Sequence, residues 1–248
     1  MVTGAGGGIG RAMCHALKTA GAHVIGTDVT SEPPDLGIPT WYRHDVTEWQ
    51  AWTEVVSSIE QRFGRLDCLI NNAGIALSES IANTTLEQWR RLMSVNVESI
   101  FLGLRACLPL LRKSGAERPG GSTVVNVSST AGLRGVPFGA AYSTTKGAVA
   151  LLTKSAAKEF GALGYPIRVN SVHPGAIETS MLESIVAQQV ESGFAKSAEA
   201  LSDTWKTMAA LHRNGQPCEI AGGAVFLCSA ASSFMTGAEL VIDGGAIC

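Results

Sequence analysis

The sequence has few charged residues and no strong excess of either sign. Only 16% of its 248 residues are charged, and the formal net charge is −2. No run of Lys or Arg stands out, so the electrostatic signature of a nucleic-acid-binding protein is missing. No stretch approaches the roughly 18 apolar residues of a membrane span. No N-terminal segment joins a basic head to an apolar run. We therefore expect no nucleic-acid partner, no membrane span and no secretion signal.

Paired cysteine motifs are also missing. The six cysteines are scattered, and no Cys-x-x-Cys pair occurs among Cys14, Cys68, Cys107, Cys218, Cys228 and Cys248. Such spacing is typical of small buried hydrophobic residues rather than of a disulfide framework or a zinc site. We therefore expect free thiols, no metal site and a reducing, cytoplasmic compartment.

Strand-like and helix-like segments alternate along the whole chain. Short runs of branched apolar residues predict strands buried on both faces at 22–27, 66–70, 123–127, 167–172 and 239–242. Helical periodicity occupies 9–20, 49–63, 86–112, 140–163 and 218–229. Without an internal repeat or a low-complexity linker, this order predicts a single α/β domain. Its expected architecture is a Rossmann-like, doubly wound parallel sheet with helices on both faces.

Two segments depart from this regular order. Only Met1 and Val2 precede Thr3-Gly4, fewer than the roughly five residues of a typical strand, so the first strand is expected to be short. Residues 178–216 are long, have helical stretches and add no strand. Ligands of doubly wound sheets bind beyond the carboxyl ends of the strands. We therefore predict that 178–216 is a substrate lid.

A glycine-rich turn, Thr3-Gly4-Ala5-Gly6-Gly7-Gly8-Ile9-Gly10, leads directly into the first predicted helix. Such glycines let a pyrophosphate approach the backbone at a helix N-terminus. Asp28 ends the second predicted strand about 20 residues on, where a carboxylate can bind the adenine ribose hydroxyls. The alternatives are a turn without a ligand and a surface carboxylate. Because Asp28 would repel a 2′-phosphate and Arg11 is the one nearby cation, the pattern favours NAD over NADP.

Tyr142 is the one tyrosine of three that has a lysine, Lys146, four residues later. On a helix these side chains share a face, and an ammonium group lowers the phenol pKa from its usual value near 10. Such a tyrosine can exchange a proton with an alcohol or a carbonyl. Ser129 lies thirteen residues before Tyr142, just after a predicted strand. Asn96, in the long preceding helix, is either a buried helix-bending residue or part of this site.

Together these residues resemble the short-chain dehydrogenase/reductase family over essentially the whole chain. The glycine-rich turn is similar to the family's Thr-Gly-x-x-x-Gly-x-Gly, and Asn71-Asn72-Ala73-Gly74 to its Asn-Asn-Ala-Gly. Ser129, Tyr142 and Lys146 resemble its catalytic Ser and Tyr-x-x-x-Lys. Asn96 resembles the asparagine that completes the tetrad. Pro174-Gly175 with Thr179 resembles the segment beside the nicotinamide.

The resemblance implies a role for each of these residues. Tyr142 would exchange the substrate proton, Ser129 would hold the substrate oxygen, and Asn96 would anchor a water in a proton relay. Lys146 would bind the nicotinamide ribose and lower the pKa of Tyr142. Ser128 would be structural or line the substrate pocket. The implied cofactor-binding residues are Gly4, Gly8, Ile9, Gly10, Asp28, Asp45, Val46, Asn72, Ala73, Gly74, Tyr142, Lys146, Pro174, Gly175, Ile177 and Thr179.

The segments 44–46 and 167–174 most resemble secondary-alcohol and hydroxysteroid dehydrogenases, and the expected pocket wall (75–77, 131–136 and 178–216) is mostly apolar. This implies NAD-dependent interconversion of a bulky apolar secondary alcohol, such as a terpene alcohol or a steroid, and its ketone. The alternatives are an NADPH-dependent ketoacyl-type reductase of the same family and a catalytically silent NAD-binding sensor. The resemblance also implies a homotetramer, or a homodimer, built through two long helices and the C-terminal strand.

Overall fold

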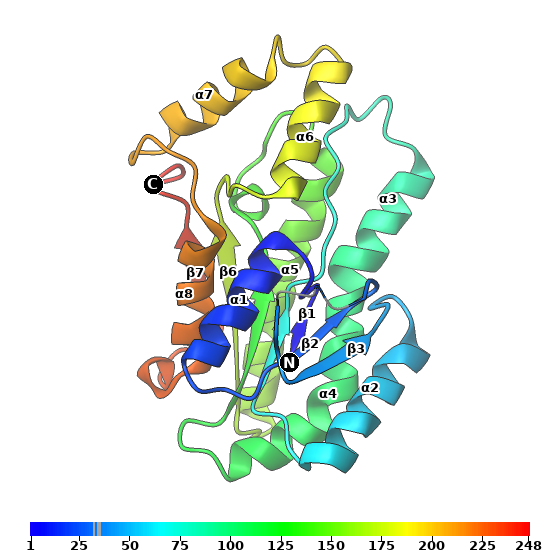
Figure 1. Ribbon diagram of the computed structural model, residues 1–248, viewed down its shortest axis with the longest axis vertical. Helices are drawn as coiled ribbons and strands as arrows, with labels where there is room; N and C mark the ends of the chain where they lie inside the picture. Colours follow the sequence, from blue (N-terminus) through cyan, green and yellow to red (C-terminus); the bar gives the residue numbers. More distant parts are fainter. Residues whose placement is uncertain (32, 34–35) are drawn as a thin grey trace.

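A seven-stranded parallel sheet forms the centre of the molecule in the computed structural model, which describes residues 1–31, 33 and 36–248 (Figure 1). The strand order is β3-β2-β1-β4-β5-β6-β7. The strands are β1 (Val2–Thr3), β2 (Ile25–Asp28), β3 (Thr40–Arg43), β4 (Cys68–Asn71), β5 (Ser122–Val127), β6 (Ile167–Pro174) and β7 (Glu239–Ile242). The chain builds outward from β1 to β3 and then returns to β4. The direction of winding therefore switches between β1 and β4, where such sheets bind ligands.

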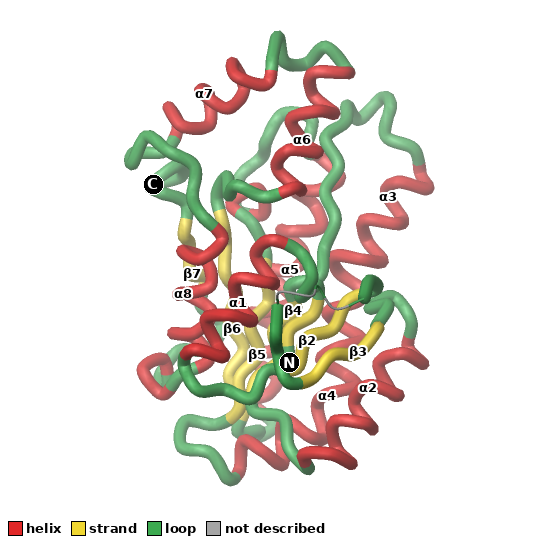
Figure 2. The backbone as a smooth tube through the Cα atoms, viewed as in Figure 1, coloured by secondary structure: helices red, strands yellow, loops and turns green. Residues whose placement is uncertain are grey.

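Helices cover both faces of this sheet, as the sequence predicted (Figure 2). On one face, α1 (Gly8–Thr19) packs beside α8 (Pro217–Cys228), and both bury residues in a core with β1, β5 and β6. On the other face lie α2 (Trp49–Phe63), α4 (Ser99–Ala116) and α5 (Ala140–Ala162), around a second core that includes Trp52 and Val149. The predicted Rossmann-like α/β fold is confirmed.

The central strands β5 and β6 are buried along their whole length, and both mix branched apolar residues with polar ones. Their polar side chains are satisfied by hydrogen bonds inside the layers. Asn71 Nδ2 donates to Asn126 Oδ1 at 2.9 Å, and Asn126 Nδ2 donates to Thr153 Oγ1 at 2.9 Å. This chain of amides ties β4, β5 and α5 together below the carboxyl edge of the sheet.

Two predictions of secondary structure need correction. No strand was predicted at Thr40–Arg43, but these residues form β3 at the edge of the sheet. Because β3 pairs on one side only and is half exposed, it lacks the run of branched apolar residues that marks a central strand. The helix predicted at 86–112 is divided into α3 (Leu86–Met93), a π-helical turn η1 (Ser94–Glu98) and α4. Such turns interrupt helices most often at functional sites.

The same helical stretch, Leu86–Ala116, is long and apolar enough by length and composition to cross a membrane, which the sequence analysis did not anticipate. Half of its most apolar window is buried inside the structure. Its α4 part packs against α2, β4 and β5. A core helix of a globular protein passes the same test, and this burial is what such a helix requires.

The segment after β6 contains α6 (Ser180–Glu191) and α7 (Ala198–Met208) and adds no strand to the sheet of the described residues. Neither helix has a buried residue. Both stand beyond the carboxyl ends of the strands and meet at an angle (Figure 1). A β-bridge between Ile177 and Gly215 joins the two ends of this segment.

Candidate active site

A cavity of about 300 Å³ opens at the carboxyl edge of the sheet, within the size range of small-molecule sites. Most of the residues that the sequence singled out line it, although they come from distant parts of the chain. They are Gly4, Gly8, Ile9, Gly10, Asp28, Asn72, Ala73, Gly74, Ser129, Tyr142, Lys146, Pro174, Gly175, Ile177 and Thr179. Ser128 also lines the cavity, whereas Asp45, Val46 and Asn96 lie outside its wall.

The glycine-rich turn is folded so closely on itself that side chains do not fit. Gly4 has a φ of +62°, and a Cβ there would lie 2.8 Å from Ala73 Cα. A Cβ at Gly10 would overlap the carbonyl oxygen of Gly4. Helix α1 begins at Gly8 without a side-chain cap, so its first backbone N–H groups remain available at the cavity. This arrangement fits the pyrophosphate of a dinucleotide.

Asn72 holds the glycine-rich turn against the end of β4. Its Nδ2 donates hydrogen bonds to the carbonyl oxygens of Thr3 and Gly4, at 3.0 and 3.1 Å. Thr3 Oγ1 in turn accepts hydrogen bonds from the backbone N–H groups of Asn72 and Ala73, at 3.0 and 3.1 Å. Asn72 therefore shapes the floor of the cavity as well as lining it. The role of Thr3 was missed, although its place next to Gly4 in the turn motif was the available signal.

Asp28 lies at the end of β2 and lines the cavity. Its Oδ2 accepts a hydrogen bond from the Gly6 N–H at 3.0 Å, and its Oδ1 accepts bonds from the Thr30 N–H and hydroxyl, both at 3.1 Å. Arg43 is paired with Asp28 in the sheet register and reaches the Val29 carbonyl. This second nearby cation was not visible from the sequence, because β3 was not predicted.

Asp45 and Val46 stabilise the loop after β3 and do not line the cavity. The Asp45 carboxylate accepts hydrogen bonds from the Thr47 N–H and hydroxyl, at 3.0 and 2.7 Å, and the first of these contributes most to a lowered pKa of Asp45. Val46 is buried in the core, and its carbonyl accepts a hydrogen bond from Trp52 Nε1. The predicted adenine contacts of these two residues stay predictions.

Tyr142 and Lys146 lie one turn apart at the start of α5, and both line the cavity with Ser129. Lys146 Nζ is 5.7 Å from the centroid of the Tyr142 ring and donates a hydrogen bond to the Val127 carbonyl at 2.9 Å. The Ser129 hydroxyl hydrogen-bonds the Tyr142 phenol. The expected face of α5 is therefore formed, with a phenol, a hydroxyl and an ammonium group around one space.

The acidity of Tyr142 in this structure differs from the sequence-based prediction. Burial raises the pKa of Tyr142, and the hydrogen bond with Ser129 opposes that shift only in part. Burial also lowers the pKa of Lys146 to about 8. The prediction of a lowered Tyr142 pKa was wrong for this structure. The physical reason is that desolvation outweighs an ammonium that points to the Val127 carbonyl rather than to the phenol oxygen.

Asn96 sits in the π-helical turn and is fully buried. Its side chain pairs with the backbone of Ile75, accepting a bond from the N–H and donating to the carbonyl, each at 2.9 Å. Its Nδ2 also donates to Thr145 Oγ1 at 3.0 Å. Asn96 therefore fixes the loop after β4, which carries Gly74 and Ile75 into the cavity wall. Asn96 is thus a buried polar residue where the helix is interrupted, and its membership of the catalytic group stays a prediction.

Two further residues, Ser128 and His173, position the segment after β5 that carries Ser129. Ser128 Oγ donates a hydrogen bond to the Lys146 carbonyl at 2.8 Å, which anchors β5 to α5. His173 was not predicted as a site residue, yet it is completely buried and its Nδ1 lies 3.1 Å from the Ser129 carbonyl oxygen. Its Nε2 lies 2.8 Å from Ser171 Oγ. The signal that could have found it is its position directly before Pro174-Gly175.

The segment after β6 completes the cavity. A Cβ at Gly175 would lie 2.8 Å from Asp243 Cα, so the backbone passes close to the C-terminal segment there. Thr179 caps α6, since its Oγ1 accepts a hydrogen bond from the Leu182 N–H at 3.3 Å. Ile177 is buried beside them. Next to this segment, Met181, Leu182 and Ile185 of α6 supply an apolar wall.

The comparisons with known proteins agree with this geometry. A family model described as enoyl-(acyl carrier protein) reductase matches residues 4–246. The NADP-dependent (R)-specific alcohol dehydrogenase of Lentilactobacillus kefiri is 35% identical over 99% of this chain and 94% of its own length. Cyclopentanol dehydrogenase of Comamonas sp. is 38% identical over 99% of this chain and 95% of its own length.

A solved structure gives the same result. The aldohexose dehydrogenase of Thermoplasma acidophilum has a TM-score of 0.88 and 30% identity, covering 99% of this chain and 92% of that one. Each of these three proteins matches 99% of this chain. The chain thus belongs to the short-chain dehydrogenase/reductase family and is an oxidoreductase acting on CH–OH groups with a nicotinamide cofactor.

Proposed function

We propose that the protein interconverts a bulky apolar secondary alcohol and its ketone by NAD-dependent hydride transfer, with Tyr142 as the acid and base. The observation that carries this proposal is the convergence of Ser129, Tyr142 and Lys146 on the cavity that the glycine-rich turn also lines. When bound, the nicotinamide would supply the hydride acceptor. Side chains of this protein would move the proton of the substrate hydroxyl and hold its oxygen.

In the oxidation direction, the Tyr142 phenolate accepts the proton of the substrate hydroxyl. Ser129 donates a hydrogen bond to the same oxygen and holds it as a carbonyl forms. Lys146 lines the cavity beside Tyr142 and would bind the nicotinamide ribose. Asn96 keeps the loop after β4 in place through its two bonds to Ile75, and it anchors a water in the relay that carries the proton away. In the reduction direction, Tyr142 returns the proton.

The preference for NAD rests on Asp28. Its carboxylate lines the cavity at the end of β2, where it can accept hydrogen bonds from the ribose hydroxyls and repels a 2′-phosphate. The L. kefiri relative is NADP-dependent by name. The proposed preference for NAD is therefore inferred from Asp28 of this chain and not from that relative.

Steady-state kinetics with both cofactors test this preference. We expect kcat/KM to favour NAD by at least about 100-fold, and Asp28→Ala to remove most of that difference because the repulsion is lost. Arg43→Ala in the Asp28→Ala background is the matched control, since Arg43 is the cation paired with Asp28 in the sheet. It should weaken NADP use without affecting NAD. Equal efficiency of the natural protein with NADP contradicts the proposal.

The apolar substrate follows from the cavity wall. Ile75, Met181, Leu182 and Ile185 line it, and among the described lining residues Lys146 is the one basic group. A substrate with a phosphate or carboxylate therefore has no free cation to bind. A hydrophobic cyclic alcohol suits this wall, and cyclopentanol dehydrogenase is a relative whose name points the same way.

We assign residues 178–216 as the lid over this substrate. Helix α6 supplies the apolar wall, and it is tied across the cavity mouth to the loop after β4. The Ser78 N–H donates to Gln188 Oε1, and Gln189 Nε2 donates to Ser78 Oγ, both at 2.9 Å. The lid is also held by stacking of Phe138 on Phe194, with ring centroids 3.6 Å apart. The absence of buried residues in α6 and α7 lets this segment move as a unit.

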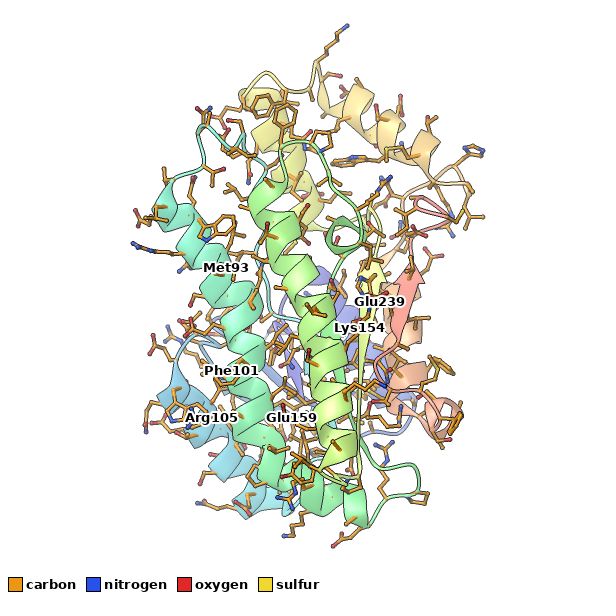
Figure 3. All side chains as sticks on the ribbon, turned by 180° about the vertical axis from the view of Figure 1, so that it is seen from behind. Met93, Phe101, Arg105, Lys154, Glu159 and Glu239 are labelled. Atoms are coloured by element: carbon orange, nitrogen blue, oxygen red, sulfur yellow. The ribbon has the colours of Figure 1, made fainter. Side chains whose placement is uncertain are left out.

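A homotetramer is the proposed assembly. Helices α4 and α5 lie side by side on the back of the molecule, with Met93 and Phe101 along this face (Figure 3). A groove on the face is lined by Trp89, Met93, Val97, Phe101 and Leu152, and the Phe101 side chain is half exposed. The ion pair of Lys154 with Glu239, 2.6 Å apart, joins α5 to the edge strand β7, which is the second surface available for pairing.

A second candidate is a ketoacyl-type reductase that uses NADPH, favoured by the similarity to a 3-oxoacyl-[acyl-carrier-protein] reductase of Thermotoga maritima, which is 35% identical over 100% of this chain and 96% of its own length. Two parallel assays of the pure protein separate the candidates: NADH formation from NAD with a panel of cyclic secondary alcohols, and NADPH consumption with an acyl thioester ketone. We expect turnover with at least one bulky apolar alcohol. Turnover with NADPH and an acyl thioester ketone alone favours the second candidate. Tight NAD binding without any turnover favours a cofactor-binding sensor.

A further inference from the structure

Cys68 and Cys228 face each other at the edge of the sheet opposite to the candidate active site. Cys68 begins β4 and is partly exposed, whereas Cys228 ends α8 and is buried. Cys68 Sγ donates a hydrogen bond to the Cys228 carbonyl oxygen at 3.8 Å, so the Cys68 thiol lies against the residue that carries the second thiol. Residues 160 positions apart in the chain are thus brought into direct contact by the packing of α8 on the sheet.

Arg118 places a positive charge on this pair. Its Nη1 lies 3.3 Å from Cys68 Sγ and 3.2 Å from the Asp67 carbonyl, and its Nη2 donates to the Cys228 carbonyl at 2.5 Å. In the part of the chain that the structure describes, each hydrogen-bond acceptor of Arg118 is a carbonyl or this sulfur. Arg168 is a second, buried guanidinium next to α8, bonded to the Leu227 and Ser229 carbonyls. The Arg118 guanidinium favours the ionised form of the Cys68 sulfur that it contacts.

The ionisation of the two thiols follows from these contacts. The hydrogen bond from Cys228 and the charge of Arg118 lower the pKa of Cys68 to about 6, while the pKa of Cys228 is raised. In contrast, burial raises the pKa of Cys14 and of Cys107 to about 12. Cys68 is therefore the more acidic thiol of the pair. A partly exposed thiolate beside a second thiol is the arrangement that oxidants attack first.

We propose that Cys68 and Cys228 form a redox-active pair that a hydroperoxide converts into a reversible disulfide. The Cys68 thiolate attacks one peroxide oxygen, the O–O bond breaks and hydroxide leaves, so that Cys68 becomes a sulfenic acid. Cys228 then loses its proton and attacks the Cys68 sulfur. The S–O bond breaks, a second hydroxide leaves and takes up that proton as water, and the S–S bond forms. The two sulfurs lose two electrons in total, which reduce the peroxide.

Treating the folded protein with a small excess of hydrogen peroxide tests this proposal. We expect the number of titratable thiols, counted after unfolding, to fall by two, and the mass to fall by two hydrogens. A proteolytic digest should contain the peptides of Cys68 and Cys228 joined, and dithiothreitol should separate them again. If both residues stay reduced while the exposed Cys218 and Cys248 are oxidised, the pair is inert and the proposal fails.

Variants identify the role of each group. In Cys228→Ser the sulfenic acid of Cys68 should persist and be trapped by dimedone, whereas Cys107→Ser, the matched buried control, should form the bridge normally. Arg118→Met should slow oxidation of Cys68 at least tenfold, and Arg118→Lys should restore much of the rate. A bridge that forms equally fast in Arg118→Met, or only in urea, contradicts the proposal. Because the pair lies away from the cavity, the reduced Cys228→Ser variant is expected to keep the alcohol dehydrogenase activity.

Discussion

The ability of Tyr142 to exchange a proton depends on the residues that the fold brings around its phenol group. Burial raises its pKa, so the phenol needs a hydrogen bond from Ser129 and a nearby cation to ionise during turnover. Lys146 Nζ lies 5.7 Å from the centroid of the Tyr142 ring, and burial lowers the pKa of Lys146 itself to about 8. The pair therefore works only when both groups are held in the same buried space.

A second buried group, His44, makes the stability of the fold depend on pH. Its pKa is lowered to about 4, mainly by burial between Thr27 and Trp52, from a usual value of 6.5. Below pH 6.5 the His44 side chain binds a proton in the unfolded chain but stays neutral in the folded one. The free energy of unfolding therefore falls as the pH falls toward 4. Between about pH 7.5 and about pH 5, this group alone accounts for a loss of about 2 kcal/mol.

Urea unfolding at these two pH values checks this prediction. His44→Phe keeps a ring against Trp52 but cannot titrate, so it should lose about 2 kcal/mol less than the natural protein on acidification. An unchanged acid loss in His44→Phe excludes His44 as its source.

At the scale of elements, the glycine-rich turn and α1 form one unit with β4. Gly10→Ala would place a methyl group against the Gly4 carbonyl and 2.6 Å from Asn72 Nδ2, so the turn must open. We expect the Kd for NADH to rise more than about tenfold, measured by fluorescence titration. Gly222→Ala on the exposed face of α8 meets no atom within 4 Å and should leave binding unchanged. Unaltered affinity in Gly10→Ala contradicts the role of the turn.

How well each element could be predicted depends on how completely its pattern reflects burial. Strands β5 and β6 are buried on both faces, and their apolar runs identify them. Strand β3 contains Trp41 and Tyr42 but is half exposed at the sheet edge, so it has no comparable run. The π-helical turn at Asn96 depends on hydrogen bonds to Ile75, which is distant in sequence. Likewise, no local pattern could indicate that Arg43 lies beside Asp28 or that Cys68 meets Cys228.

At the scale of the whole molecule, the face formed by α4 and α5 carries the proposed assembly. Replacing the exposed Phe101 by Glu puts a charge in the middle of this face, and we expect the mass measured by light scattering to fall to that of a smaller oligomer. Ile81→Glu, which changes an exposed residue in the loop before α3, should leave the mass unchanged. A monomeric mass for the natural protein contradicts the tetramer.

The most direct test of the account is the Tyr142→Phe variant, assayed with NAD and the best alcohol of the panel. The change keeps the ring in its place on α5 and removes only the oxygen that accepts the substrate proton. We expect kcat to fall by at least about 1,000-fold, while NADH binds with nearly the same Kd. A variant that keeps more than a few per cent of the natural kcat shows that another group moves the proton, and it contradicts the assignment of Tyr142.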